Sequence, residues 1–150
     1  MSESDEILRE VHLEASVSRV WAAIADSQLF GEWFHCTVSG PFQVGEVVTC
    51  RSTYTTEENF VWQKHIKAIE PERYFAYTWT PGTTGADLLA PDGEQTLVEF
   101  TLEAVDTGTT LTIRESGFAS LSEATRANSY RINTEGWNAQ VENITQYVRN

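Results

Sequence analysis

The sequence is short of basic residues, and this shortage excludes two classes of partner. It contains 10 lysines and arginines against 22 aspartates and glutamates, which gives a formal net charge of −12. Because phosphate binding requires clustered basic side chains, we do not expect nucleic acid as a partner. An anionic membrane surface is disfavoured for the same reason. The acidity is better explained as a contribution to solubility.

Long apolar runs, cysteines and metal-binding spacings are also scarce. No apolar run approaches the length of a membrane span, so no membrane insertion is expected. The N-terminal segment MSESDEILRE is acidic and does not resemble a signal peptide. Cys36 and Cys50 have no metal-binding spacing, and we expect reduced thiols in a cytoplasmic protein. The sequence shows no phosphate-binding loop, so we expect neither a metal nor a cofactor.

The feature that is present, and that organises the chain, is a long amphipathic segment at residues 120–149. Apolar or aromatic side chains recur there at helical spacing, at Ala127, Tyr130, Trp137, Val141, Ile144 and Val148. Ser120, followed three residues later by Glu123, has the form of a capping box and predicts the helix start. Gly136 is a poor helix former, and its place beside Trp137 suggests a close approach of the helix to a flat surface.

The preceding residues predict two short helices and a series of strands. Residues 7–14 alternate between apolar and polar, as in a strand. Ser16 can cap a helix that stops near Asp26, and a second short helix is expected over residues 27–33. Further strands are expected over residues 47–56, 59–69, 73–80, 95–105 and 109–115, with a long loop between 81 and 93. Short turns between them predict an antiparallel meander.

The architecture follows from the need to bury one face of this sheet. An antiparallel sheet with one apolar face must cover that face, and the long C-terminal helix is the available cover. The chain of 150 residues, 41% of them hydrophobic, suits a single domain over residues 1–150. The sequence therefore predicts an α+β fold, in which space between sheet and helix suits a hydrophobic ligand.

Several short motifs, in this order, resemble the START-like superfamily, also called SRPBCC or the birch-pollen-allergen fold. Within it, the chain is most similar to the family named after the activator of the heat-shock-protein-90 ATPase. The similarity spans about residues 11–148. The residues that carry it are Ser18-Arg19-Val20-Trp21 with Asp26 and Trp33, Glu70-Pro71-Glu72-Arg73 before Phe75-Ala76-Tyr77-Thr78-Trp79, Val98-Glu99-Phe100, Gly108-Thr109-Thr110-Leu111-Thr112-Ile113, Glu115-Ser116-Gly117-Phe118 and Gly136-Trp137.

The resemblance implies a helix-grip fold: a curved antiparallel sheet wrapped round a long C-terminal helix, with two short helices after the first strand. It also implies a central pocket, but no single activity. Members of the family include co-chaperone-like proteins and ligand carriers, and relatives in the superfamily include aromatase/cyclases and hydrolases. A chaperone partner, a homodimer and a role in stress response are therefore expectations from the resemblance alone.

The residues predicted to contact a ligand are mostly aromatic. Glu115 is the best candidate for chemistry, because alternation with Leu111 and Ile113 directs it inward. A carboxylate in an apolar cavity could bind a ligand or transfer protons. The alternative is a structural pairing at the sheet edge. The predicted ligand-binding residues are Trp33, Trp62, His65, Tyr77, Trp79, Phe100, Glu115, Tyr130 and Trp137.

Three functions stay open at this point, and we favour the first. It is the binding of a small hydrophobic or aromatic molecule, a lipid included, without chemistry. The second is an enzyme, a cyclase or hydrolase, acting in the same cavity. It needs at least two convergent polar groups, and the sequence offers only Glu115 and His65. The third is a co-chaperone-like protein that interacts with heat-shock protein 90.

Overall fold

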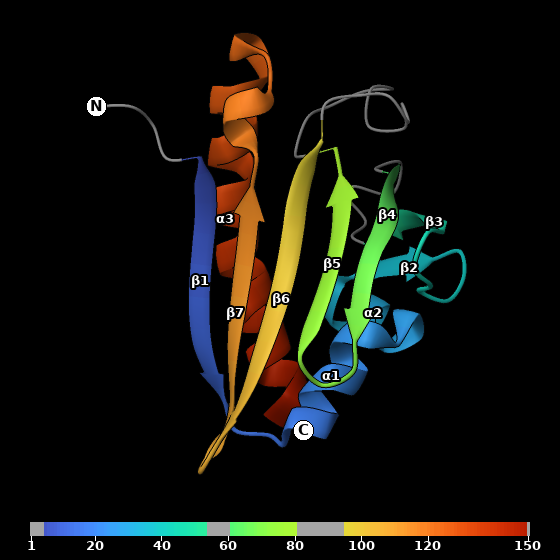
Figure 1. Ribbon diagram of the computed structural model, residues 1–150, viewed down its shortest axis with the longest axis vertical. Coiled ribbons are helices and arrows are strands. Elements are labelled where there is room, and N and C mark those ends of the chain that lie inside the picture. Colours follow the sequence, from blue (N-terminus) through green and yellow to red (C-terminus); the bar gives the residue numbers. More distant parts are fainter. Residues whose placement is uncertain (1–4, 54–60, 81–94, 150) are drawn as a thin grey trace.

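The computed structural model describes residues 5–53, 61–80 and 95–149. They form a seven-stranded antiparallel sheet in the order β1-β7-β6-β5-β4-β3-β2, with helices on one side of it (Figure 1). The predicted α+β helix-grip architecture is therefore confirmed. The elements are β1 (Glu6–Leu13), α1 (Val17–Ala25), α2 (Ser27–Phe34), β2 (Cys36–Val38), β3 (Val47–Ser52), β4 (Val61–Glu70), β5 (Tyr74–Trp79), β6 (Thr96–Val105), β7 (Gly108–Ser116), η3 (Phe118–Ser120) and α3 (Glu123–Arg149).

The two short helices lie where they were predicted, to within one residue at each end. The Ser16 hydroxyl accepts a hydrogen bond from the backbone N–H of Arg19 at the start of α1. Asp26 ends α1 and also caps α2, since its carboxylate accepts from the backbone N–H groups of Gln28 and Leu29 at 2.9 and 3.1 Å. A single aspartate thus sets the bend between the two helices.

The start of the C-terminal helix was predicted wrongly. The helix α3 begins at Glu123, and its first backbone bond runs from Arg126 N–H to the carbonyl of Ser122, at 2.9 Å. The Ser120 hydroxyl instead donates to the Gly117 carbonyl at 2.7 Å, within the short 3₁₀ turn η3. Gly117 has φ 98°, and this left-handed residue turns the chain into η3 before α3 can begin.

The strand predictions hold for β1 and β4 to β7 within one or two residues at each end. The strand β2 (Cys36–Val38) was not predicted, because three residues are too few for an alternation pattern. The strand predicted over residues 47–56 ends at Ser52. Residues 54–60 and the predicted loop over 81–93 lie outside the described residues.

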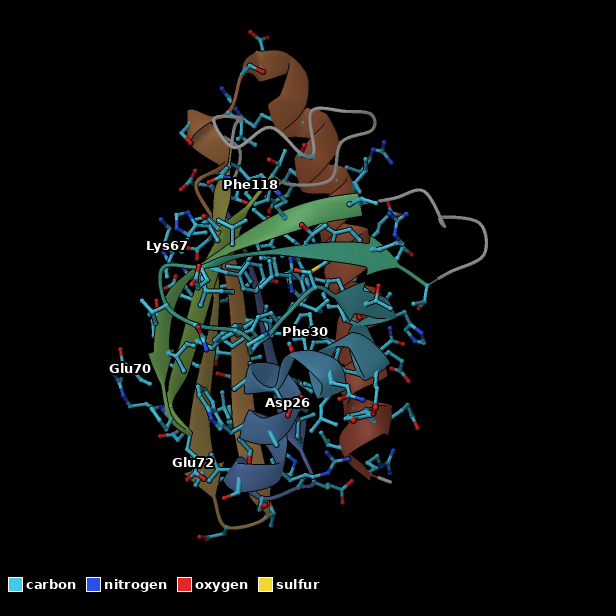
Figure 2. The ribbon with its side chains drawn as sticks, turned by 90° about the vertical axis from the view of Figure 1, so that its right-hand side faces the viewer. Asp26, Phe30, Lys67, Glu70, Glu72 and Phe118 are labelled. Atoms are coloured by element: carbon cyan, nitrogen blue, oxygen red, sulfur yellow. The ribbon has the colours of Figure 1, made fainter. Side chains whose placement is uncertain are left out.

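The sheet curves so that its inner face and the helices enclose the core. Figure 2 shows β3 and β4 bending across toward α3, while α1 and α2 occupy the opposite end of the interior. A register shift between Ile66 and Ala68 in β4 bends this strand. The helix α3 packs against β1, α1 and α2. Within the described ranges, no helix is long and apolar enough to cross a membrane.

The close approach predicted at Gly136 is wrong, although the predicted helix phase is right. Trp137, Ile144 and Val148 are buried as expected, whereas Ala127, near the start of the helix, is exposed. A side chain at Gly136 would meet nothing within 4 Å. A tight contact is found instead at Gly31, where a Cβ would come within 2.2 Å of the Cys36 carbonyl oxygen. The chain folds back sharply from α2 into β2 at this point, and sequence periodicity carries no trace of such a contact.

Candidate functional site

The strand β7 places Glu115 in the interior, as its alternation predicts. Leu111, Ile113 and Glu115 all lie on the inner face, and the Glu115 side chain is fully buried. An ionised carboxylate in such a place needs hydrogen-bond donors, because burial without them is very costly. The strands β5 and β6 and the helix α3 supply these donors.

Both oxygens of the Glu115 carboxylate accept hydrogen bonds from protein side chains. Oε1 accepts from the Trp137 indole at 2.8 Å and from the Asn133 amide at 3.0 Å. Oε2 accepts from the Trp79 indole at 2.7 Å, from the Asn133 amide at 3.0 Å and from the Thr96 hydroxyl. These donors come from β5, the start of β6 and α3. We call Glu115 and its four donors the carboxylate clamp, because they join the sheet to the C-terminal helix.

The electrostatics of the clamp result from two opposing effects. Burial raises the pKa of Glu115, and the hydrogen bonds from Thr96, Trp79, Trp137 and Asn133 lower it again, leaving the pKa above its ordinary value. Both oxygens are already engaged by donors. The geometry therefore favours a structural role over proton transfer, and direct ligand contact by Glu115 stays a prediction.

Aromatic rings from several elements meet around Phe34, at the end of α2. Its ring centroid lies 6.1 to 6.2 Å from those of Trp62, Trp79 and Trp137. The rings of Trp79 and Trp137, both bound to Glu115, are 5.9 Å apart. We call the connected set the aromatic cluster; its members are Phe30, Trp33, Phe34, Phe42, Trp62, Phe75, Tyr77, Trp79, Phe100 and Trp137.

The structure therefore brings together six of the predicted aromatic residues and leaves a seventh apart. Tyr130 packs on Phe118 with ring centroids 5.2 Å apart, and its hydroxyl donates to the Glu6 carbonyl at 3.1 Å. Trp33 is a member of the cluster, but its indole N–H is fixed on the Ala23 carbonyl at 2.8 Å. Phe30 and Phe34 were not predicted as site residues, although Phe30 lies three residues before Trp33 and therefore on the same side of the predicted helix.

The strand β4 directs a lysine inward and the predicted histidine outward. Trp62, Lys64 and Ile66 are the buried residues of the strand, so alternation places His65 on the opposite face, where it is half-buried. His65 is thus not brought to the aromatic cluster. The missed residue is Lys64, which is fully buried. In the sequence, Lys64 lies two residues after Trp62 and two before Ile66, so strand alternation places all three on one face of β4.

The Lys64 ammonium group lies among aromatic rings. Its Nζ is 3.5 Å from the ring centroid of Phe30, 4.3 Å from that of Tyr77 and 4.9 Å from that of Phe34. Burial lowers the pKa of Lys64 to about 8. Within the described residues, neither this nitrogen nor the buried hydroxyl of Tyr77 has a hydrogen-bond partner.

The two cysteines lie in the same region as buried, free thiols. Cys36 on β2 and Cys50 on β3 form a side-chain hydrogen bond with each other. Among the residues that the structure describes, no group of three or more histidine, cysteine or acidic side chains could hold a metal ion.

A family model for the activator of Hsp90 ATPase homolog 1-like proteins matches residues 14–149. The chain belongs to this family. The match covers the clamp, the aromatic cluster and all three helices, as the motif resemblance predicted. No curated protein matches the chain.

Solved structures with this fold include proteins from several sources. One from Mesorhizobium loti has a TM-score of 0.75 at 21% identity, over 96% of each chain. One from Arthrobacter aurescens has a TM-score of 0.75 at 19% identity, over 97% of this chain and 86% of the other. DynU16, from the dynemicin biosynthetic locus, has a TM-score of 0.72 at 20% identity, over 98% of this chain and 48% of its own. At these identities the likeness concerns the fold alone.

Proposed function

We propose that this protein binds a small hydrophobic or aromatic molecule in its interior, between the sheet and α3, without chemical conversion. The observation that carries this proposal is the convergence of aromatic rings from α2, β4, β5 and α3 around Phe34. Binding sites for small organic molecules are lined mainly by such side chains, with a few polar groups among them. The family includes ligand carriers, which agrees with this role.

The carboxylate clamp supports the proposal by holding two walls of the site. Trp79 and Trp137 both donate to Glu115, so neither indole can turn without losing a hydrogen bond to a buried charge. Rings held in this way are pre-organised, and a ligand loses less free energy in ordering them. The same engagement leaves Glu115 without a free oxygen for the general acid or base that a cyclase or hydrolase would need.

The test is a fluorescence titration with N-phenyl-1-naphthylamine, an uncharged apolar probe. We expect saturable binding of one probe per chain, with quenching of tryptophan emission. Phe34→Leu removes the central ring at a small loss of volume and should weaken binding at least about fivefold, whereas Leu8→Ala, at a position 54% exposed on β1, should not. Absence of one-to-one binding, or equal effects of both variants, would overturn the proposal.

Turnover separates the enzyme alternative from the binder. The native protein should release no product from a panel of aryl esters and polyketide-like substrates while the naphthylamine probe still binds. Turnover that is lost in Glu115→Gln with probe binding intact would show that the site is catalytic.

The co-chaperone function is supported by the family alone. It would appear as a rise in the ATPase rate of a purified heat-shock protein 90 when this protein is added. We expect no such rise, and a dose-dependent rise would favour the co-chaperone role.

A further inference from the structure

Among the described residues, one fully buried cationic side chain has no hydrogen-bond acceptor. Lys64 is fully buried on β4, and its Nζ makes no hydrogen bond with any described residue. A long lysine side chain usually carries its ammonium group out to water. Here the rings of Phe30, Phe34 and Tyr77 enclose it. Their attraction for a cation offsets part of the cost of burial, but it occupies none of the three N–H donors with an oxygen acceptor.

Tyr77, whose ring lies close to Lys64, carries a second donor that has no acceptor among the described residues. The ring of Tyr77 is fully buried on β5, and Lys64 Nζ lies 4.3 Å from its centroid. Burial raises the pKa of Tyr77, and the charge of Glu115 adds to this effect, so the phenol keeps its proton at neutral pH. Buried polar groups in folded proteins almost always have partners, and two neighbouring exceptions of the donor type require an explanation.

The other titratable groups that the structure describes around Lys64 do not supply that acceptor. Cys36 and Cys50, on β2 and β3, interact with Lys64 electrostatically but share their hydrogen bond with each other. The Glu115 carboxylate is engaged by its own four donors. The described interior therefore presents a positive charge and a hydroxyl donor, with aromatic rings on several sides.

We propose that the ligand is an aromatic acid, whose carboxylate, sulfonate or phenolate group accepts hydrogen bonds from Lys64 Nζ and Tyr77 Oη. The aromatic part of the ligand lies against the rings of the aromatic cluster. This inference rests on the proposed function, because it assigns a charge to the small molecule that is proposed to bind in the interior. A negative charge supplies the acceptor that both donors lack, and it restores charge balance to a buried ammonium group.

The chain itself provides the control for this proposal. It has two lysines, and the second, Lys67, lies three residues away on the exposed outer face of β4. Figure 2 shows Lys67 at the outer side of the sheet and Phe30, the ring nearest to Lys64, in the interior. Lys64→Met and Lys67→Met therefore make the same change of charge, one inside and one outside.

The experiment compares two probes that differ by one acidic group. N-phenyl-1-naphthylamine is uncharged, and 1-anilinonaphthalene-8-sulfonate is the same molecule with a sulfonate. We expect Lys64→Met to weaken sulfonate binding about tenfold or more, as for loss of a charged hydrogen bond, while changing binding of the uncharged probe less than threefold. Tyr77→Phe should weaken sulfonate binding about threefold to tenfold, and Lys67→Met should change neither probe.

The outcomes separate failure of this inference from failure of the proposed function. If neither probe binds the native protein, both fail. If the uncharged probe binds but Lys64→Met and Tyr77→Phe leave the ratio of the two affinities within twofold of the native value, only the aromatic acid is excluded. The same holds if Lys67→Met changes the ratio as much as Lys64→Met. If Lys64→Met does not fold, Tyr77→Phe alone decides between these results.

Discussion

The clamp makes a sharp prediction for Glu115→Gln, a change that keeps shape and removes charge. An amide has one acceptor oxygen, so its NH₂ group must replace one of the two carboxylate oxygens. The Asn133 amide can flip and the Thr96 hydroxyl can rotate to meet it, but the indole N–H groups of Trp79 and Trp137 only donate. Each carboxylate oxygen serves one indole, so either orientation of the glutamine leaves one indole without an acceptor.

The magnitude follows from these contacts. A buried donor left without a partner costs about 1–3 kcal/mol, and the surviving bonds lose their charge assistance. Removal of a buried charge offsets part of this loss. We expect the free energy of unfolding to fall by about 2–3 kcal/mol, measured in urea at pH 7 by far-ultraviolet circular dichroism. Glu103→Gln, at an exposed position on β6, should change it by less than about 0.5 kcal/mol.

A spectroscopic signature accompanies the stability change. The chain has five tryptophans, and only the indole N–H resonances of Trp79 and Trp137 should shift strongly in the folded variant. Burial raises the pKa of Glu115, so the native protein should gain stability relative to Glu115→Gln as the pH falls from neutral toward 4.5. A loss below about 0.5 kcal/mol at pH 7, with unshifted indole resonances, would show that the carboxylate does not hold the two rings.

Three further predictions concern the core. Because burial lowers the pKa of Lys64 from 10.5 to about 8, Lys64→Met should raise the free energy of unfolding at pH 7 by about 1–3 kcal/mol. This gain should vanish as the pH rises from 8 to above 10.5. A gain that stays constant over this pH range in urea unfolding would contradict the prediction. Trp137→Ala should lower the free energy of unfolding in urea by about 3–5 kcal/mol, because the ring is buried. A loss below about 1 kcal/mol would mean that the ring is exposed. In thermal unfolding, Gly136→Ala should stabilise the protein by up to about 1 kcal/mol, because alanine is the better helix former. Gly31→Ala should destabilise the protein by about 1–3 kcal/mol through overpacking against the Cys36 carbonyl. The opposite order of the two stabilities would refute the contact at Gly31.

The sequence by itself determined the features that depend on neighbouring residues. The cap at Ser16 acts over three residues, so it marks the start of α1 without knowledge of the fold. Strand alternation directed Glu115 inward, and helical spacing turned Trp137 toward the core. The family motifs then supplied the order of the elements, which such local patterns leave undetermined.

Only the tertiary structure decided what these inward side chains meet. The donors to Glu115 lie 18 to 36 residues away in the sequence, and no local spacing selects them. Alternation also directed Lys64 inward, but a lysine at that position could still reach water along its flexible stem. The curved sheet and the rings of α2 close that path, so the burial of this charge follows from the packing of distant elements.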